Sequence, residues 1–394
     1  MASKTENRGQ TPGDQNRGLS PLPFARPTID EAMIAAVAET LRSRWIASGP
    51  QVAAFERALS DYVGGRPVRT LTSATGAMQA ALELIGIEPG DEVITPAQSF
   101  FATANVIERS GATTVFVDVD PATRNIDFAQ ADAAVTPRTR VLLPTHYNAP
   151  LDPGALGRFA SRHRVRVIED AALAIGSRVG SRPVGATGDL VSFSFHPNKN
   201  LTTIEGGALV VNDEAEAKRI EEIRFHGIKR LADGTRDVEH AGAKLNLSDV
   251  SARLGLEQLA HLDAWCQARE RLASHYFRCL EGDRFLTPER LPPRANPGHS
   301  WNMFAVLLPL AAARTTRKQF IDAMHKEGIG IGISYEALHL STLFRRKGFR
   351  EGQFPNAERI ARETASLPLF PEMRETDVER VCEAMKRTLE RKAA

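Results

Sequence analysis

The sequence predicts an α/β protein, with a mostly parallel central sheet in a large domain and a smaller α+β domain at the C-terminal end. Short runs rich in Val, Ile and Phe alternate with helical patterns over roughly the first 250 residues, which is typical of βαβ units. These runs are apolar throughout, as expected of strands covered on both faces. The chain of 394 residues is also too long for one typical domain. We therefore expect a large domain over residues 21–250 and a small domain over residues 251–394.

The elements of the large domain follow from this alternation. The predicted strands are residues 92–95, 113–119, 141–145, 165–169, 190–195 and 208–211. Helical patterns lie between them at residues 75–85, 102–110 and 153–163. Since strands joined through helices pair in parallel, the sheet should carry its functional groups at the carboxyl ends of its strands.

The pattern changes near residue 246. Residues 248–278 predict one long helix, because six apolar side chains fall at helical spacing: Val250, Leu254, Leu256, Leu259, Leu262 and Trp265. Prolines at 288, 292, 293 and 297 predict a loop after it. The remainder predicts a strand at 303–308, a helix at 316–327, a strand at 330–335 bracketed by glycines, and a last helix from about residue 376.

Composition excludes several classes of function. Lys and Arg number 50 against 48 Asp and Glu, so the net charge of +2 gives no electrostatic case for nucleic acid or an anionic membrane as the partner. No run of about 18 apolar residues is present, so we expect no membrane span. The three cysteines are far apart and form no CxxC pair, which predicts a reducing, cytoplasmic compartment and no metal site. Residues 1–20 are polar and predict a disordered tail, not a signal peptide.

One lysine and one aspartate carry the chemistry. Lys199 follows an apolar strand and a Pro-Asn turn, and Asp170 ends another apolar run. A lysine amine forms a Schiff base once its surroundings lower its pKa, and a buried carboxylate needs a partner. Together they predict a pocket for pyridoxal 5′-phosphate (PLP), with Lys199 on the aldehyde and Asp170 on the pyridinium nitrogen. Considered alone, Lys199 would be interpreted as a solvated surface lysine, and Asp170 would be interpreted as the N-cap of a helix.

The segment from Thr72 to Ala77 predicts the site of the cofactor phosphate. It opens a helix, and the free N–H groups of a helix N-terminus bind phosphate. Ser73 and Thr75 add hydroxyl donors, and Ser194 is a further candidate on the strand before Lys199. The alternative is a capped helix with no ligand. An aromatic residue after the strand at 92–95 could stack on the ring, and we choose Phe100. Core packing is the alternative for Phe100 and for its neighbour Phe101.

From about residue 22 to its end the chain resembles the DegT/StrS-type sugar aminotransferases, PLP enzymes of fold type I. Within that family it is most similar to the UDP-4-amino-4-deoxy-L-arabinose–oxoglutarate aminotransferases. The motifs that carry the resemblance are Ser48-Gly49-Pro50 with Phe55-Glu56, Ser73-Ala74-Thr75, Pro89-Gly90-Asp91-Glu92-Val93-Ile94, Val117-Asp118-Val119, His146-Tyr147 with Asp152, Glu169-Asp170-Ala171-Ala172, Phe193-Ser194-Phe195-His196, Lys199-Asn200, Glu205-Gly206-Gly207, Phe225-His226-Gly227 and Leu245-Asn246-Leu247-Ser248-Asp249.

The resemblance implies roles for individual residues. Lys199 would be the Schiff-base lysine and Asp170 the partner of the ring nitrogen; Ala74, Thr75 and Ser194 would bind the phosphate, and Phe100 would stack on the ring. Asn246 would reach the cofactor phosphate of the neighbouring subunit in a homodimer with shared active sites. His196 would line the pocket or support it through a hydrogen bond. The region of residues 21–250 would be the PLP-binding domain.

Two positions depart from the family pattern. Leu173 stands three residues after the aspartate, where the family usually has His or Gln near the phenolic oxygen of the cofactor. That oxygen would then be served by water or another donor, or the pKa of the lysine–cofactor imine would be altered. Ile204 stands where many members have Gly, at a more variable position.

The resemblance implies an aminotransferase that moves an amino group from an amino acid, with L-glutamate as the expected donor, to a nucleotide-linked keto-sugar in lipopolysaccharide or polysaccharide biosynthesis. Loops near Trp45, His146 and residues 334–339 would set the sugar specificity. One alternative is a sugar dehydratase on the same scaffold, against which Lys199 argues, because such relatives carry His there. The other is a PLP-binding regulator or sensor with little turnover, which Leu173 keeps open.

Overall fold

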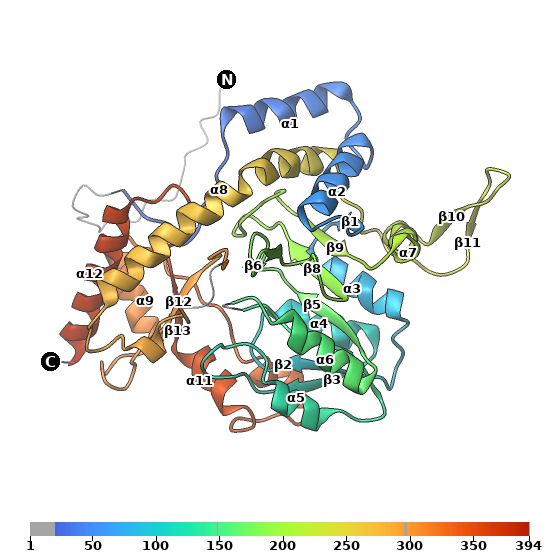
Figure 1. Ribbon diagram of the computed structural model, residues 1–394. Coiled ribbons are helices and arrows are strands. Elements are labelled where there is room, and N and C mark those ends of the chain that lie inside the picture. The colour runs from blue at the N-terminus through green and yellow to red at the C-terminus, as the bar shows by residue number, and fades with distance from the viewer. Residues whose placement is uncertain (1–19, 148, 295–297, 394) are drawn as a thin grey trace, which may run out of the picture.

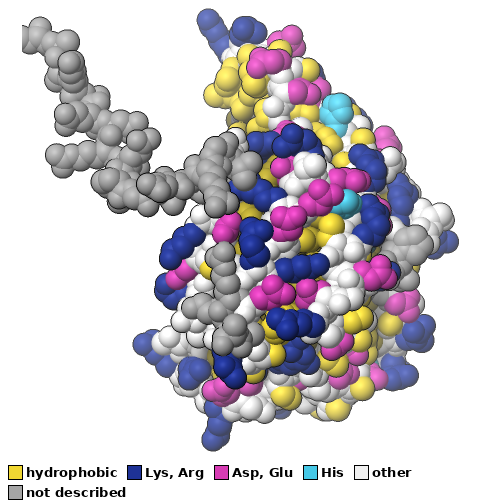
Figure 2. Space-filling model, turned by 90° about the vertical axis from the view of Figure 1, so that its left-hand side faces the viewer, with side chains coloured by type: hydrophobic (Ala, Val, Ile, Leu, Met, Phe, Trp, Pro, Cys, Tyr) yellow, Lys and Arg dark blue, Asp and Glu magenta, His cyan; other side chains and the backbone are white. Residues whose placement is uncertain are grey.

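The computed structural model describes residues 20–147, 149–294 and 298–393. The predicted disordered tail, residues 1–20, lies outside this part of the chain except for its last residue. No helix in the described part is both long and apolar enough to cross a membrane. Cationic and anionic side chains are interspersed over the face shown in Figure 2, in keeping with the near-zero net charge.

A seven-stranded sheet forms the centre of the large domain (Figure 1). Its strands lie in the order β1 (Val68–Leu71), β9 (Gly207–Val210), β8 (Leu190–Ser194), β5 (Arg166–Asp170), β4 (Thr139–Leu142), β2 (Glu92–Pro96) and β3 (Thr113–Val117). All neighbours from β8 to β3 pair in parallel, and only β9 runs antiparallel to its two neighbours. The predicted α/β class is therefore confirmed. The six predicted strands are present with shifted ends, whereas β1 was not predicted.

Helices cover both faces of this sheet. One face packs on α3 (Ala74–Ile85), α4 (Phe101–Ser110) and α7 (Glu214–Arg224). The other packs on α2 (Pro50–Tyr62), α5 (Phe128–Ala134), α6 (Pro153–His163) and the first part of α8 (Asp249–Leu280). Successive strand residues, such as Ala208 and Leu209, belong to opposite hydrophobic clusters. This two-sided burial is why the strands read as continuous apolar runs.

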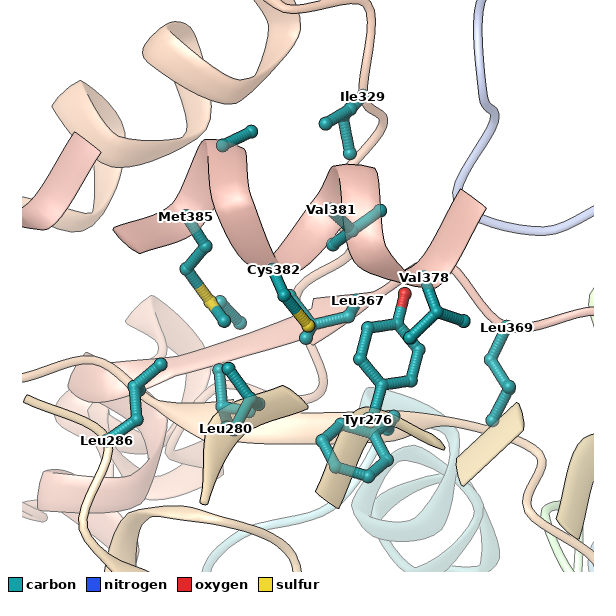
Figure 3. Packing of buried hydrophobic residues seen from close by; sticks show 14 of the residues in the cluster. Tyr276, Leu280, Leu286, Ile329, Leu367, Leu369, Val378, Val381, Cys382 and Met385 are labelled. Carbon is teal, nitrogen blue, oxygen red and sulfur yellow. The ribbon is translucent and has the colours of Figure 1, made fainter. Parts of the chain in front are cut away.

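Helix α8 connects the large domain to the smaller α+β region at the C-terminal end. It has 32 residues and is therefore about 48 Å long. Its first half packs on α2 and on α1 (Glu31–Ser43). Its second half packs on α12 (Glu375–Ala393), and Figure 3 shows Tyr276 and Leu280 opposite Val381 and Cys382. The same cluster includes β12 (Phe304–Leu307), β13 (Thr364–Leu367) and α9 (Arg317–Lys326).

The remaining elements are short. They are the hairpins β6 (Arg178–Val179) with β7 (Arg182–Pro183) and β10 (Ile228–Arg230) with β11 (Arg236–Val238), the helices α10 (Thr342–Arg346) and α11 (Pro355–Glu363), and single 3₁₀ turns at Pro288–Arg290 and Leu338–Leu340. The hairpin β10–β11 projects from the body of the protein (Figure 1).

The strand predicted at residues 330–335 is wrong. The segment makes only isolated bridges, from Ile329 to Leu22 and from Gly332 to Ser366. A side chain on Gly330 would lie 2.7 Å from the backbone of Phe24, and one on Gly332 would meet the ring of Phe24. The glycines therefore allow a close crossing of the N-terminal segment, and the strand that pairs with β12 is β13, which was not predicted.

Asp249, the last residue of the motif Leu245-Asn246-Leu247-Ser248-Asp249, has a structural role. It is fully buried, and its carboxylate accepts hydrogen bonds from the backbone N–H groups of Gly49, Gln51 and Val52 at the start of α2. The N-cap residue of α2 is Gly49, which has no side chain that could accept these hydrogen bonds. We expect Asp249→Ala to lower the free energy of unfolding by about 2–4 kcal/mol, because three N–H groups lose a charged acceptor. Urea unfolding of the purified protein measures this.

The matched control is Asp213→Ala. Asp213 caps α7 in the same way, accepting from the N–H groups of Ala215 and Glu216, but it is exposed. Water can replace its hydrogen bonds, so the expected loss is about 1 kcal/mol. Equal losses in the two variants would contradict the special role of Asp249.

Candidate active site

A pocket of about 320 Å³ opens at the carboxyl ends of β2, β4, β5 and β8. This is the edge at which α/β sheets bind their ligands. The pocket is lined by every predicted site residue but one: Ser73, Ala74, Thr75, Phe100, Asp170, Ser194, His196 and Lys199. Ser99 and Thr145 also line it and were not named as site residues, whereas Tyr335 lines it from the predicted specificity segment 334–339.

Lys199 lies in the turn after β8. Its backbone N–H donates to the carbonyl of His196 at 2.8 Å, which closes the turn. Burial lowers the pKa of the amine from 10.5 to about 8, and the carboxylate of Asp170 opposes this shift. A larger fraction of the amine is therefore neutral near pH 7 than in an exposed lysine, as a nucleophilic lysine requires.

The next residue anchors this turn. Asn200 is buried and donates its amide to the carbonyls of Ile175 and Ser300. Its Oδ1 accepts from the amide of Asn302 at 3.3 Å. The Lys199-Asn200 motif thus pairs a pocket lysine with a structural amide, and it ties the lysine turn to the segment before β12.

Asp170 is the last residue of β5 and is 4% exposed. Its Oδ2 accepts from the hydroxyl of Thr103 at 2.7 Å, and its Oδ1 accepts from the N–H of Ala172 at 3.2 Å. Burial raises the pKa of the carboxyl, while these hydrogen bonds and the charge of Lys199 oppose the rise. Each carboxylate oxygen can accept more than one hydrogen bond, so the group keeps capacity for a cationic donor in the pocket.

The start of α3 forms another wall. Ser73 is the N-cap and accepts from the N–H of Gly76 at 3.0 Å. The first N–H groups of the helix have no partner inside it, so Ala74 and Thr75 present donors beside the pocket. A side chain on Gly207 would lie 2.3 Å from the backbone of Ser73, so glycine is needed for β9 to approach this close. That contact explains the last glycine of the Glu205-Gly206-Gly207 motif.

Two aromatic rings flank the pocket. Phe100 is 54% exposed, and its ring centroid lies 5.6 Å from that of Tyr335. Tyr335 comes from the segment after α9, and its ring also contacts that of Tyr147 at 6.1 Å between centroids. Burial raises the pKa of the Tyr335 phenol, so it stays protonated at neutral pH.

The structure separates His146 from this pocket. Its Nδ1 accepts from the N–H of Leu151, so its Nε2 carries the proton and donates to Glu169 at 2.8 Å. Both side chains are buried and line a different hollow with the start of α6. Trp45 is 60% exposed and also lies outside the lining of the main pocket. Of the three predicted specificity regions, residues 334–339 reach the main pocket through Tyr335, and the loop of His146 reaches it through the neighbouring Thr145.

Leu173 and His196 do line the pocket. Leu173 is 6% exposed and packs with Tyr147, Met303 and Ala305, so it forms an apolar wall where the family pattern has a hydrogen-bonding side chain. His196 is exposed, and its Nδ1 lies 2.8 Å from the amide oxygen of Asn198.

Asn246 is the one predicted site residue that does not line the pocket of its own chain. It is partly buried and forms an isolated bridge with Leu71. Its amide donates to the hydroxyl of Ser48, and its Oδ1 accepts from the amine of Lys244.

Comparison with known proteins gives the class and the family. The profile of the DegT/DnrJ/EryC1/StrS aminotransferase family matches residues 27–386. The spore coat polysaccharide biosynthesis protein SpsC of Bacillus subtilis is 37% identical over 378 residues, which are 93% of this chain and 96% of SpsC. The PLP form of the proposed sugar aminotransferase Spr1654 of Streptococcus pneumoniae superposes with a TM-score of 0.89 at 29% identity, over 95% of this chain and all of that one.

A further relative was solved in the presence of a sugar nucleotide. DesI, in the presence of its TDP-sugar product, superposes with a TM-score of 0.85 at 28% identity, over 96% of this chain and 95% of that one. The fold, the pocket and these likenesses define a PLP-dependent aminotransferase of fold type I. The chain belongs to the DegT/DnrJ/EryC1/StrS aminotransferase family.

The pocket fits the PLP that this class requires. It offers an amine of lowered pKa, a buried carboxylate with accepting capacity, and the open N–H groups of a helix N-terminus. These match the aldehyde, the pyridinium nitrogen and the phosphate of the cofactor in turn.

Proposed function

We propose that this enzyme transfers an amino group from L-glutamate to the carbonyl of a nucleotide-linked keto-sugar. The observation that carries the proposal is the pairing of Lys199, with its pKa lowered to about 8, and buried Asp170 in one pocket. The TDP-sugar of DesI supports a nucleotide-linked substrate. Glutamate is the donor that the resemblance implies.

Each predicted residue of the pocket has a proposed role in holding the cofactor. Lys199 Nζ would hold the cofactor aldehyde, Asp170 would pair with the ring nitrogen, and Phe100 would stack on the ring. Ser73, Ala74, Thr75 and Ser194 would bind the phosphate, and His196 would line the pocket. When bound, PLP supplies an electron sink for the carbanion formed at the Cα of the amino donor.

Lys199 also moves the proton. With its pKa lowered to about 8, the amine of Lys199 is partly unprotonated near neutral pH, so it could accept a proton from the Cα of an amino donor held in the pocket. Lys199 would thus act first as a base and then as an acid. It would fill the same two roles when the keto-sugar is bound. Tyr335 and Phe100 narrow the mouth of the pocket and help to exclude water.

We propose that the enzyme is a homodimer with shared active sites, in which Asn246 reaches the cofactor phosphate of the partner subunit. Exposed apolar side chains support a partner: Ile34, Leu41, Trp45, Ile46 and Phe225 are each 43–60% exposed. Analytical ultracentrifugation checks this proposal, and a species of 43.1 kDa alone would contradict it.

Two further proposals concern the whole chain. We propose a division into a PLP-binding domain at residues 21–250 and a small domain at residues 251–394, supported by separate hydrophobic clusters around the seven-stranded sheet and around β12–β13. We also propose a cytoplasmic location, supported by three free cysteines.

A two-step assay tests the proposed function. The enzyme is first loaded with PLP and L-glutamate, and we expect the absorption band of the lysine-bound cofactor to shift to that of the aminated cofactor, with release of 2-oxoglutarate. Nucleotide keto-sugars that differ in nucleotide and carbonyl position, among them the UDP-linked 4-keto-pentose of the L-arabinose aminotransferases, are then added. Mass spectrometry should find one amino-sugar nucleotide, with return of the original band.

The alternatives give different results. A sensor with little turnover would bind PLP without the glutamate-driven shift. A dehydratase would release a deoxy-sugar that keeps no donor nitrogen. A spectral shift with another amino acid but not with glutamate would replace the donor and leave the rest of the proposal standing.

A further inference from the structure

Three hydroxyl groups form a buried chain that ends on Asp170. Thr103 Oγ1 lies 2.7 Å from Asp170 Oδ2, Ser99 Oγ lies 2.8 Å from Thr103 Oγ1, and Thr145 Oγ1 lies 2.8 Å from Ser99 Oγ. Their exposed fractions are 0%, 1% and 4%. Three neighbouring parts of the sheet supply them: Ser99 and Thr103 follow β2, Thr145 follows β4, and Asp170 ends β5.

The direction of the chain follows from the number of hydrogens. An ionised carboxylate only accepts, so the Thr103 hydroxyl donates to Asp170. Its one hydrogen is then used, and it must accept from Ser99. Ser99 has likewise used its hydrogen and must accept from Thr145. All three hydroxyls therefore point their hydrogens toward the carboxylate, an arrangement in which each bond polarises and strengthens the next.

We propose that this hydroxyl relay, Thr145 to Ser99 to Thr103, keeps Asp170 ionised so that the proton of the ion pair stays on the cofactor nitrogen. The inference rests on the proposed role of Asp170. Thr103 and Ser99 act as positioning residues, since they reach the cofactor only through the carboxylate. Without the relay, the buried carboxylate would become the stronger base and take the proton from the ring.

The surroundings of Asp170 make this contribution necessary. The titratable groups that face it include Lys199, His146 and Tyr335. Lys199 would hold the cofactor aldehyde, the Nε2 of His146 lies 2.8 Å from Glu169, and Tyr335 is a neutral phenol. The hydrogen bonds from Thr103 and from the N–H of Ala172 are made directly to the carboxylate, so they contribute directly to the stabilisation of its ionised form.

Cofactor labelled with ¹⁵N at the ring nitrogen tests the relay without reference to activity. The nitrogen chemical shift reports whether the ring is protonated. In the wild-type holoenzyme we expect the protonated value. Thr103→Val keeps the side-chain shape but removes the hydroxyl, and we expect the shift to move most of the way to the unprotonated value. Ser99→Ala should move it in the same direction by less, and Thr103→Ser should restore the wild-type value.

Thr114→Val is the matched control. Thr114 is also a buried threonine whose hydroxyl donates to a carboxylate, that of Glu108 at 2.8 Å, but it does not line the pocket. Its variant should leave the ring nitrogen protonated. A protonated nitrogen in both Thr103→Val and Ser99→Ala would overturn the relay. If Thr103→Val does not fold, Ser99→Ala alone decides between these results. An unprotonated nitrogen already in the wild type would overturn the relay together with the assignment of Asp170.

Discussion

Replacing Lys199 with alanine is expected to abolish amino transfer and the covalent retention of PLP. The variant loses the amine that binds the aldehyde and the group that moves the proton, and proton transfer by a positioned side chain alone contributes roughly 10²–10⁴ in rate. We expect a loss of at least ~10³ in kcat/KM. The absorption band of the lysine-bound cofactor should also be missing after gel filtration, which measures the effect without turnover.

The pH dependence of cofactor capture gives a second measure of Lys199. Only the neutral amine attacks an aldehyde, and the pKa of about 8 leaves roughly one amine in ten neutral at pH 7, against about one in three thousand for a lysine at 10.5. The rate at which apoenzyme captures PLP should therefore rise with pH and level off above about pH 8.

Two variants control for charge and for general effects. Lys199→Arg keeps a cation but cannot form the imine, so it should be as inactive as Lys199→Ala. Lys318→Ala removes an exposed lysine of α9, paired with Asp322, and should behave as wild type. A persistent cofactor band in Lys199→Ala would mean that another lysine holds the cofactor.

Asp170→Asn is expected to lower kcat/KM by roughly 10²–10³ at unchanged fold, the cost of losing one partner of a buried ion pair. The amide has nearly the same shape, but it cannot stabilise a cationic ring nitrogen. The cofactor should still attach to Lys199, because its aldehyde chemistry does not need Asp170. Asp170→Asn should thus lose activity but keep the absorption band of the lysine-bound cofactor, whereas Lys199→Ala should lose both. Steady-state kinetics and absorption spectra measure the two effects.

The control for Asp170 is Asp118→Asn. Asp118 is equally buried, and its carboxylate accepts from the N–H groups of Asn356 and Ala357 at the start of α11. It lies outside the pocket lining, so its variant should lose stability but keep kcat/KM per folded molecule. Wild-type kinetics in Asp170→Asn would sink the assignment of Asp170.

The parts of the site that sequence analysis found share one property. Lys199, Asp170 and Ser73 each follow or end a short apolar run or open a helix, so local patterns locate them. Because parallel strands end at one edge of a sheet, the convergence of these residues could be expected from the sequence alone. The burial of the sheet on both faces could also be predicted from the sequence, because it produces strands that are apolar throughout.

The missed features depend on contacts between distant segments. The hydroxyls of Ser99, Thr103 and Thr145 approach Asp170 only because β2, β4 and β5 lie side by side in the folded sheet. Serine and threonine are too common in loops for such a relay to stand out in a sequence. The edge strand β1 was missed for a related reason: its four residues, with Arg69 and Thr70 among them, form no apolar run. The false strand at 330–335 came from apolar residues that serve a glycine-dependent crossing over Phe24.

The length of α8 has a consequence for how this enzyme denatures. This uninterrupted helix packs both in the hydrophobic cluster beside the seven-stranded sheet and in the cluster around β12 and β13. Unfolding of either cluster would therefore disrupt the packing of the other. Thermal denaturation should therefore be a single cooperative event, although the seven-stranded sheet and the β12–β13 pair lie in separate hydrophobic clusters. A protease that cuts within α8 would damage both halves at once, where a flexible linker would have released two stable fragments.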